Sequence, residues 1–314
     1  MKDHYLPQVY LKQFRNSAKM LWKYKVISTR LEKSQLVSTA QVCYGHDFYK
    51  IDFAETLQAH KIDNPLFLEK KGLKNYEDKY EGVINAIRKR ESFILTKHAR
   101  FFINGLLLIK LRNDRIRKSL LNTDALQASV DNVIGRMKES IQKFEQETGL
   151  KLLDALENRK QEFLSDERSP KDMHLRILLD EVSGGSELTE SIITFLMNSH
   201  WFIFHASPSH AFIYSDNPGF TITSNEQVEN LKFSEKFTLC FPLTPSCAII
   251  IMSGFEDRKS DILSKIINYR KADASLVTFI NRATIANCNK DIFSNDAGIL
   301  ERAISDYRAV TQAK

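Results

Sequence analysis

The order of hydrophobic patterns along the chain is the feature that most restricts its fold. Residues 1–50 alternate apolar and polar side chains as strands do, residues 52–198 repeat them with a helical period, and residues 200–314 return to strands and end in helices. No Pro- or Ser-rich linker separates these zones. The order indicates an α+β fold in which N- and C-terminal strands share one mixed or antiparallel sheet beside a large central helical region. We expect residues 1–314 to form a single domain.

Periodicity within the zones predicts the main elements. In the first zone, Met20–Val26 and Leu36–Thr39 are expected to form a hairpin. Helices are expected over 73–91, 92–122, from Thr123 to Gly149, 150–165, 170–182 and from Ser186 to about Asn198. The last zone predicts two strand pairs, Trp201–His205 with Ala211–Ser215 and Thr238–Phe241 with Cys247–Met252. A helix over about 260–286, a strand at Asp291–Ser294 and a closing helix are expected to follow.

The positive charge of the chain is concentrated at its N-terminus. The formal net charge is +6, and residues 1–33 alone carry eight Lys and Arg against two Asp and Glu. A basic region of this kind suits nucleic acid or another polyanion, and an ordinary solvated basic surface is the alternative. We therefore consider nucleic acid as a partner and leave the oligomeric state open.

Several classes of protein are disfavoured by what the chain lacks. Its four cysteines form no C-x-x-C pair, which argues against a structural zinc site. The longest apolar run, residues 101–111, is shorter than the roughly 20 residues of a membrane span and predicts a core helix. No P-loop, G-x-G-x-x-G or G-x-S-x-G motif is present. These observations favour a soluble, cytoplasmic protein with reduced thiols and no membrane association.

Four short motifs occur along the chain in a fixed order, and together they carry a family resemblance. They are His4-Tyr5-Leu6-Pro7 with the following Tyr10-Leu11-Lys12-Gln13-Phe14, then Asp47-Phe48-Tyr49, then Phe212-Ile213-Tyr214-Ser215-Asp216-Asn217-Pro218, and then Phe241-Pro242-Leu243-Thr244-Pro245 with Asn281 and Phe293-Ser294 behind it. In this order they resemble the family catalogued as domain of unknown function 4238. Gly219 departs from the family, which tends to have an aliphatic residue there. The resemblance implies an architecture and candidate positions, and it implies no established reaction.

Two of these motifs supply the candidate catalytic residues. His4 carries an imidazole that can act as acid or base at neutral pH, and Pro7 restricts the backbone behind it. Asp216 lies where a strand ends and the chain turns, because Pro218 restricts Asn217 to extended geometry. If the two met, the carboxylate could orient the imidazole or share a metal with it. The alternatives are a histidine that tethers the N-terminus and an aspartate that bonds its own turn.

Candidate phosphate-binding residues follow the long apolar run. Arg112 and Arg115 lie three residues apart with Lys118 beyond them, so on one helix they would share a face. Guanidinium groups bind phosphate well, and a solvated helix end is the alternative. Glu77 and Glu81 form a like-charge pair that an arginine, a lysine or a divalent ion could compensate.

The remaining candidates have supporting roles. Tyr5 and Asn217 are the motif neighbours of His4 and Asp216. Asn281 could bond a ligand or, as we expect, the turn at residues 216–218. The cofactor stays unknown, with a divalent metal ion as an open alternative.

Two functions of different classes are compatible with these residues. The first is a phosphodiester hydrolase acting on nucleic acid, a nuclease-like toxin or antiviral defence effector, with His4 and Asp216 catalytic and Arg112 and Arg115 on the phosphate. The alternative is a non-catalytic module that binds nucleic acid or a protein, in which His4 and Asp216 stabilise the fold. A small-molecule sensor has no cofactor signature to support it.

Overall fold

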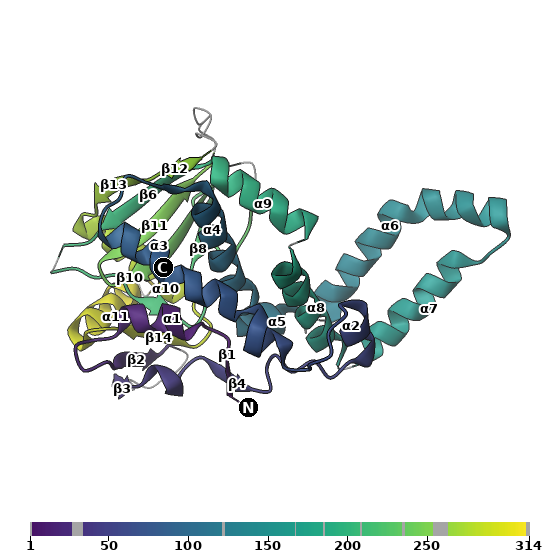
Figure 1. Ribbon diagram of the computed structural model, residues 1–314, viewed down its shortest axis with the longest axis horizontal. Coiled ribbons are helices and arrows are strands. Elements are labelled where there is room, and N and C mark those ends of the chain that lie inside the picture. The colour runs from purple at the N-terminus through teal and green to yellow at the C-terminus, as the bar shows by residue number, and fades with distance from the viewer. Residues whose placement is uncertain are drawn as a thin grey trace.

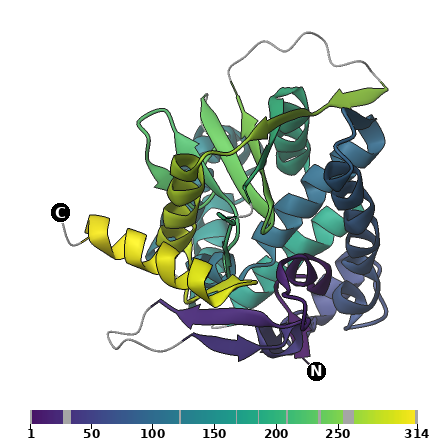
Figure 2. The same ribbon diagram turned by 90° about the vertical axis from the view of Figure 1, so that its left-hand side faces the viewer.

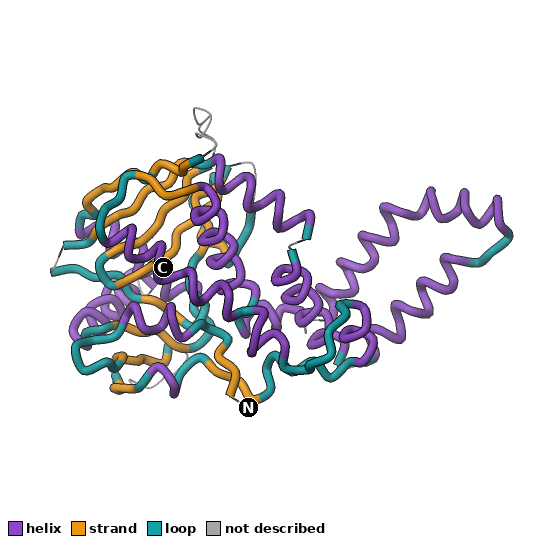
Figure 3. Tube along the Cα trace, viewed as in Figure 1, coloured by secondary structure: helices purple, strands orange, loops and turns teal. Residues whose placement is uncertain are grey.

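The computed structural model describes residues 2–26, 34–120, 123–166, 168–184, 186–207, 209–233, 236–253 and 263–311. A body of sheets and helices carries a two-helix arm, formed by α6 (Thr123–Thr148) and α7 (Leu152–Ser165), which extends to the right in Figure 1. Figure 3 shows the strands gathered in the body and the arm built of helix. Gly149 ends α6 with a φ of +72°, as the sequence predicted, because glycine adopts this conformation readily.

A six-stranded mixed sheet forms the centre of the body. Its order is β13-β6-β11-β10-β8-β9, and β13 is parallel to β6 while the other neighbours are antiparallel. The predicted pairing of Thr238–Phe241 with Cys247–Met252 is confirmed by β10 and β11. The strands are β6 (His200–His205), β8 (Phe220–Thr223), β9 (Val228–Glu229), β10 (Phe237–Thr244), β11 (Cys247–Met252) and β13 (Asn268–Lys271).

Helices cover both faces of this sheet, and the central strand shows why. In β11, Ile249 and Ile251 belong to the largest hydrophobic cluster, together with buried residues of α3 (Lys74–Arg88) and α4 (Thr96–Leu111). Ala248 and Ile250 point to the other face and contact a cluster that includes residues of α10 (Ala274–Asn287). A strand buried on both faces needs a continuous apolar run rather than an alternating one, and β11 has it.

A four-stranded sheet joins the two ends of the chain. Its order is β3-β2-β14-β7, where β2 (Leu21–Lys25) and β3 (Gln35–Val37) form the predicted N-terminal hairpin. β14 (Asp291–Ser294) pairs with β2 and with β7 (Tyr214–Ser215). Figure 2 shows these N-terminal strands beneath the closing helix α11 (Ala297–Thr311). The expectation that N- and C-terminal strands share a sheet is confirmed, and the fold class is α+β.

The other elements complete the helical zone and two small ribbons. The ribbons pair β1 (Lys2–His4) with β4 (Tyr44–His46) and β5 (Phe93–Leu95) with β12 (Ser264–Ile266). Ser186 accepts a hydrogen bond from the amide of Thr189 at 3.2 Å and caps α9, as predicted. The other helices are α1 (Gln8–Leu11), α2 (Ala54–Ala59), α5 (Asp114–Leu120), α8 (Ser169–Ser183) and α9 (Glu187–Asn198), with short turns η1 (Lys12–Phe14), η2 (Thr39–Gln41) and η3 (Leu68–Gly72).

The predicted helix over 92–122 is wrong as a single element. Its beginning is strand β5, and α4 ends at Leu111 before α5 starts at Asp114. The break has a local cause, because the side chain of Asn113 accepts a hydrogen bond from the amide of Arg115 at 2.7 Å and so begins a new helix. Arg112, Arg115 and Lys118 therefore do not share one helix face.

Two predictions for the C-terminal zone are also wrong. Ala211–Ser215 does not pair with β6, because the side chain of Asn281 bonds the backbone of residues 211 and 213 and only Tyr214–Ser215 forms a strand. The helix expected over about 260–286 begins only at Ala274, where Asp273 accepts a hydrogen bond from the amide of Leu276 at 2.8 Å. β12 and β13 precede it, and residues 254–262 lie outside the described part of the chain.

Candidate functional site

The N-terminal segment is built into the core. β1 pairs with β4, and Pro7 precedes the first turn of α1 with a φ of −57°. Tyr10 is fully buried and its hydroxyl donates a hydrogen bond to the carbonyl of Pro242 at 2.9 Å. These contacts hold the backbone on both sides of His4, so the fold determines where the imidazole lies.

The His4 ring is half-buried beside Arg112. In the described part of the chain its Nε2 is buried without a hydrogen-bond partner. Burial lowers the pKa of His4, the positive charge of Arg112 lowers it further, and the carbonyl of Ala40 raises it. The imidazole is therefore neutral at neutral pH.

Arg112 joins three separate parts of the chain from a buried position. Its Nη1 donates to Glu77 Oε1 at 2.9 Å, its Nη2 to the carbonyl of His4 at 2.7 Å and its Nε to the hydroxyl of Tyr49 at 3.0 Å. The guanidinium is 3% exposed. Arg112 is thus the arginine that compensates the charge of Glu77, and its donors bind protein groups rather than face solvent.

Asp216 lies at the end of β7 with its carboxylate turned toward the beginning of β14. Oδ1 accepts a hydrogen bond from the amide of Asn289 at 2.8 Å, and Oδ2 accepts one from the amide of Asp291 at 3.1 Å. Burial raises the pKa of Asp216 to about 6, even though these amides favour the ionised form. The side chain of Asn113 donates to the Asp216 carbonyl and connects this turn to α5.

Asn217 ties the same turn to a buried lysine and to the end of α10. Its Oδ1 accepts a hydrogen bond from Lys110 Nζ at 2.6 Å, and its Nδ2 donates to the carbonyl of Asn287 at 2.6 Å. Lys110 also donates to the carbonyl of Gly219 at 2.8 Å. Burial lowers the pKa of Lys110 well below its usual value. The Ser-Asp-Asn-Pro turn is therefore a junction between α4, α10 and the strands.

Gly219 is required at the end of this junction, which explains its departure from the family pattern. Its φ is +75°, and a Cβ at this position would collide with the ring of Phe241. We expect Gly219→Ala to lower the free energy of unfolding by about 2 kcal/mol, because strain and overpacking act together. Urea unfolding measures the loss, with Gly135→Ala as the control, since a Cβ at Gly135 has nothing within 4 Å. Equal stability of the two variants would contradict this geometry.

Asn281 and Arg115 bond the backbone near the junction, and among the described residues neither bonds the turn at residues 216–218. Asn281 bonds the backbone of residues 211 and 213, whereas the turn at 216–218 is bonded by Asn287, whose Nδ2 donates to the carbonyls of Asn217 and Gly219 at 3.3 and 2.8 Å. The prediction that Asn281 bonds that turn is wrong. The Nη1 of Arg115 donates to the carbonyl of Asn287 at 2.7 Å, at the C-terminus of α10.

The predicted residues form two groups rather than one. His4 and Arg112 meet through the His4 carbonyl, while Tyr5 and Asp216 line a common cleft. His4 is not part of the lining of that cleft, and within the described residues no hydrogen bond or ion pair joins it to Asp216.

The cleft that contains Asp216 is polar and has a volume of about 560 Å³. It lies between the β1–β4 ribbon, the start of α5 and the turn before β14. Two of its carboxylates form ion pairs: Asp291 with Lys23 at 3.2 Å and Asp114 with Lys118 at 2.5 Å. Its charged residues are Lys23, Arg117, Lys118 and Lys290 on the positive side and Asp114, Asp216 and Asp291 on the negative side.

Sequence reasoning missed the cleft residues Arg117, Lys290 and Tyr44. The guanidinium of Arg117 lies 4.5 Å from the centre of the Phe48 ring, and Nζ of Lys2 lies 4.4 Å from the centre of the Tyr44 ring. Arg117 belongs to the same basic run as Arg112 and Arg115, so the run itself was the available signal. Which of its members reach the cleft depends on the break between α4 and α5.

Three further findings concern the basic N-terminus, metal binding and membrane spans. Of the basic N-terminal residues, Lys23 lines the cleft, whereas Arg30 and Lys33 lie outside the described residues. Among the side chains that the structure describes, no three His, Cys, Asp or Glu are arranged to hold a metal ion. Across the described ranges, no helix has the length and apolar character that crossing a membrane requires.

A comparison with family models matches the part of the chain that contains these motifs. The model described as "Protein of unknown function (DUF4238)" matches residues 2–298. The chain belongs to this family. The match begins in β1 and ends in α11, so the DUF4238 region includes the cleft, the buried arginine and the Ser-Asp-Asn-Pro junction. Neither the curated proteins nor the solved structures give a match.

Proposed function

We propose that this DUF4238 protein is a non-catalytic module that binds single-stranded nucleic acid in the cleft beside Asp216. The observation that carries the proposal is the pair of cations Arg117 and Lys290 on the cleft wall, neither of which forms an ion pair within the described residues. Tyr44 also lines the cleft and is half-buried, with Lys2 Nζ 4.4 Å from the centre of its ring. Cations for phosphates beside an aromatic ring for a base are the combination that single-stranded nucleic acid requires.

The charges of the cleft support an anionic ligand. Asp114 and Asp291 are compensated by lysines, so they repel a phosphate less than free carboxylates would. Burial raises the pKa of Asp216 to about 6, so the fraction of this carboxyl that is protonated and uncharged grows as the pH falls from 7 to 6. Binding should therefore tighten as the pH falls from 7 to 6.

The candidate catalytic residues favour this proposal over hydrolysis. Each guanidinium nitrogen of Arg112 donates to Glu77, Tyr49 or the His4 carbonyl, and the side chain is only 3% exposed, so a phosphate in solvent does not reach it. Both carboxylate oxygens of Asp216 accept backbone hydrogen bonds. In the proposed module, Arg112 and Asp216 hold the walls of the cleft in place, and Arg117 and Lys290 contact the ligand.

A phosphodiester hydrolase is the second candidate, and one observation favours it. The carboxyl of Asp216 lines the cleft, and a pKa of about 6 suits a general base near neutral pH. In this function Arg117 and Lys290 would hold the scissile phosphate and Asp216 would activate a water.

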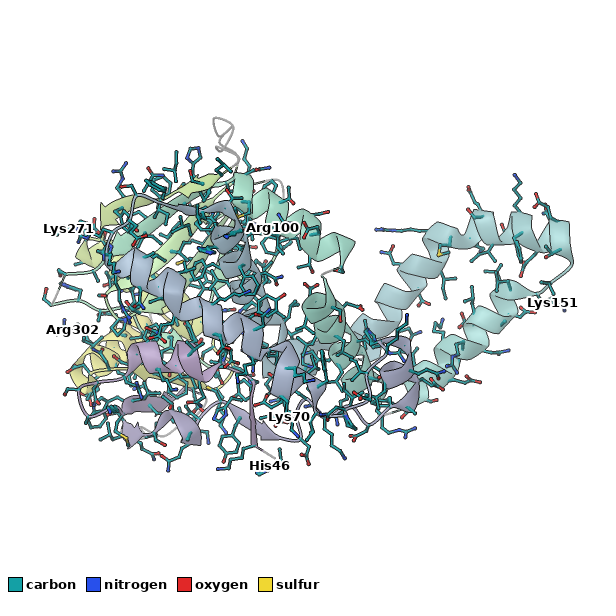
Figure 4. The ribbon with its side chains drawn as sticks, in the orientation of Figure 1. His46, Lys70, Arg100, Lys151, Lys271 and Arg302 are labelled. Atoms are coloured by element: carbon teal, nitrogen blue, oxygen red, sulfur yellow. The ribbon has the colours of Figure 1, made fainter. Side chains whose placement is uncertain are left out.

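The binding proposal predicts a specific loss on charge reversal. We expect Arg117→Glu and Lys290→Glu each to weaken binding of a fluorescent single-stranded oligonucleotide by about tenfold. Each should also reduce by about one the number of counterions released on binding, which is the slope of log K against log salt concentration. Fluorescence anisotropy at several salt concentrations measures both. Lys271→Glu is the matched control, because Lys271 is exposed on β13 and does not line the cleft, and Figure 4 shows it far from His46, which does. Equal binding by all three variants would exclude the cleft.

The same oligonucleotide separates the two functions. Labelled at its end and incubated with Mg²⁺ or Mn²⁺, it should stay intact if the protein only binds it. Shortened products that disappear in Asp216→Asn, while anisotropy still reports binding, would establish the hydrolase instead.

A further inference from the structure

A groove unrelated to the cleft lies between α3 and α4 and ends at β5. Its volume is about 770 Å³, and its walls combine aromatic and aliphatic side chains with lysines. Tyr80 and Val83 of α3 and Phe102 and Gly105 of α4 line it, and the centres of the Tyr80 and Phe102 rings are 5.6 Å apart. A Cβ at Gly105 would meet nothing within 4 Å, so the glycine leaves open space at this point of the groove.

The groove continues onto an exposed apolar patch of the β5–β12 ribbon. Phe93 is 62% exposed and lies directly opposite Ile266, which is 61% exposed. Leu95 and Leu263 are 47% and 73% exposed and adjoin them. The alternate residue Ile94 is buried, so this ribbon has one face in the core and one apolar face in solvent. A contiguous apolar surface of this kind usually marks an interface.

The α6–α7 arm carries the other group of exposed apolar side chains. Met137, Phe144 and Leu150 are 53%, 43% and 60% exposed, whereas Ile141 between them is 5% exposed. Met137 and Phe144 are seven residues apart and so lie on one side of α6, about 10 Å apart along its axis. Figure 4 labels Lys151 at the far end of the arm, next to Leu150 in the sequence and well away from the body.

We propose that the arm of a second copy of this chain docks in the groove between α3 and α4. The dimensions fit: the groove runs along α3 from Tyr76 to Ala86, about 15 Å or three helical turns, and a helix buries a stripe of that length. The net charges fit as well: the groove lining has three lysines against Asp78 and Glu91, and residues 123–165 of the arm have eight Asp and Glu against six Lys and Arg. The apolar side chains of the arm would fill the space beside Gly105 and cover the ribbon.

Symmetry determines what assembly this contact gives. Arm and groove are different surfaces, so a one-way contact would repeat from copy to copy into a ring or an open chain. Exchange of arms across a two-fold axis closes the assembly, because each copy then donates one arm and accepts one. The inference concerns assembly alone and does not depend on what the cleft binds.

The first test is the mass of the full chain in solution. Light scattering coupled to size exclusion, from about 5 to 100 μM, should give the mass of two chains. Met137→Glu combined with Phe144→Glu should give one chain, and so should Gly105→Leu, which fills the groove. Val310→Glu is the control, because Val310 is 40% exposed on α11, outside the arm and the groove. Circular dichroism melts should show that all variants stay folded.

A mixture of variants distinguishes arm exchange from other dimers. The double variant Met137→Glu with Phe144→Glu keeps an intact groove, and Gly105→Leu keeps an intact arm. An equimolar mixture of the two should therefore recover a two-chain species, held by the arm of Gly105→Leu in the groove of the double variant. A single-chain mass for the wild-type protein at 100 μM would overturn the proposal. A dimer that survives Gly105→Leu, or a mixture that stays monomeric, would also overturn it.

Discussion

Replacing Arg112 with methionine is expected to destabilise this protein by roughly 3 kcal/mol, the lower end of the cost of removing one partner from a buried ion pair, because Glu77 is 29% exposed and stays partly hydrated. The substitution leaves the Glu77 carboxylate without its cation and removes the hydrogen bonds to the His4 carbonyl and the Tyr49 hydroxyl. Arg112→Lys should recover little of this loss, because an ammonium donates from a single nitrogen, whereas the three acceptors are reached here from three nitrogens of one planar group. β1 should lose its attachment to α4.

Urea unfolding followed by circular dichroism measures the effect. Arg159→Met is the control, because Arg159 pairs with Glu162 on the exposed arm and such pairs contribute little. The double variant Arg112→Met with Glu77→Met should be more stable than Arg112→Met alone, since it removes the unpaired carboxylate as well. Unchanged stability of Arg112→Met would mean that this arginine is free to bind a ligand after all.

Asp216 is expected to make stability fall as the pH rises, which is the reverse of the usual carboxylate. Burial raises its folded-state pKa from 3.8 to about 6, so the folded protein holds the proton more tightly than the unfolded chain. The stabilisation is fully present below about pH 3.8 and is lost as the pH rises through 6. The pKa difference corresponds to a total of about 3 kcal/mol, most of it lost between pH 4 and pH 7.

The measurement is the free energy of unfolding of the wild-type protein minus that of Asp216→Asn at pH 4, 5, 6 and 7. Other titrating groups are common to both proteins and cancel. We expect this difference to fall by about 2–3 kcal/mol across the range. A difference that stays level, or rises with pH, would show that the amides of Asn289 and Asp291 outweigh burial and keep the carboxylate ionised.

Most of the fold could be predicted because its elements carry their own periodicity. The stripe over 73–91 forms α3, the run at 101–111 lies in α4, and Ser186 caps α9. The predictions that are wrong have a common cause. At Asn113, Asp273 and Asn281, one polar side chain bonds the backbone and redirects the chain, and hydrophobic periodicity does not record such a bond.

The candidate site could be predicted only in part. The motifs singled out His4, Asp216 and Asn217, and all three take part in buried or half-buried contacts with the rest of the fold. Their partners could not be predicted, because Asp216 is bonded by residues more than 70 positions away and Arg112 bonds residues 108, 63 and 35 positions away.

The sequence by itself determined the α+β class, the pairing of the two chain ends in one sheet and the family, since these follow from local pattern and motif order. Tertiary structure alone decided which basic residues reach the cleft. Arg112, Arg115 and Arg117 have the same chemistry in sequence, yet one is buried against Glu77, one caps α10 and one lines the cleft. The reason is physical: a guanidinium binds whichever acceptors surround it, and only the folded chain sets those acceptors.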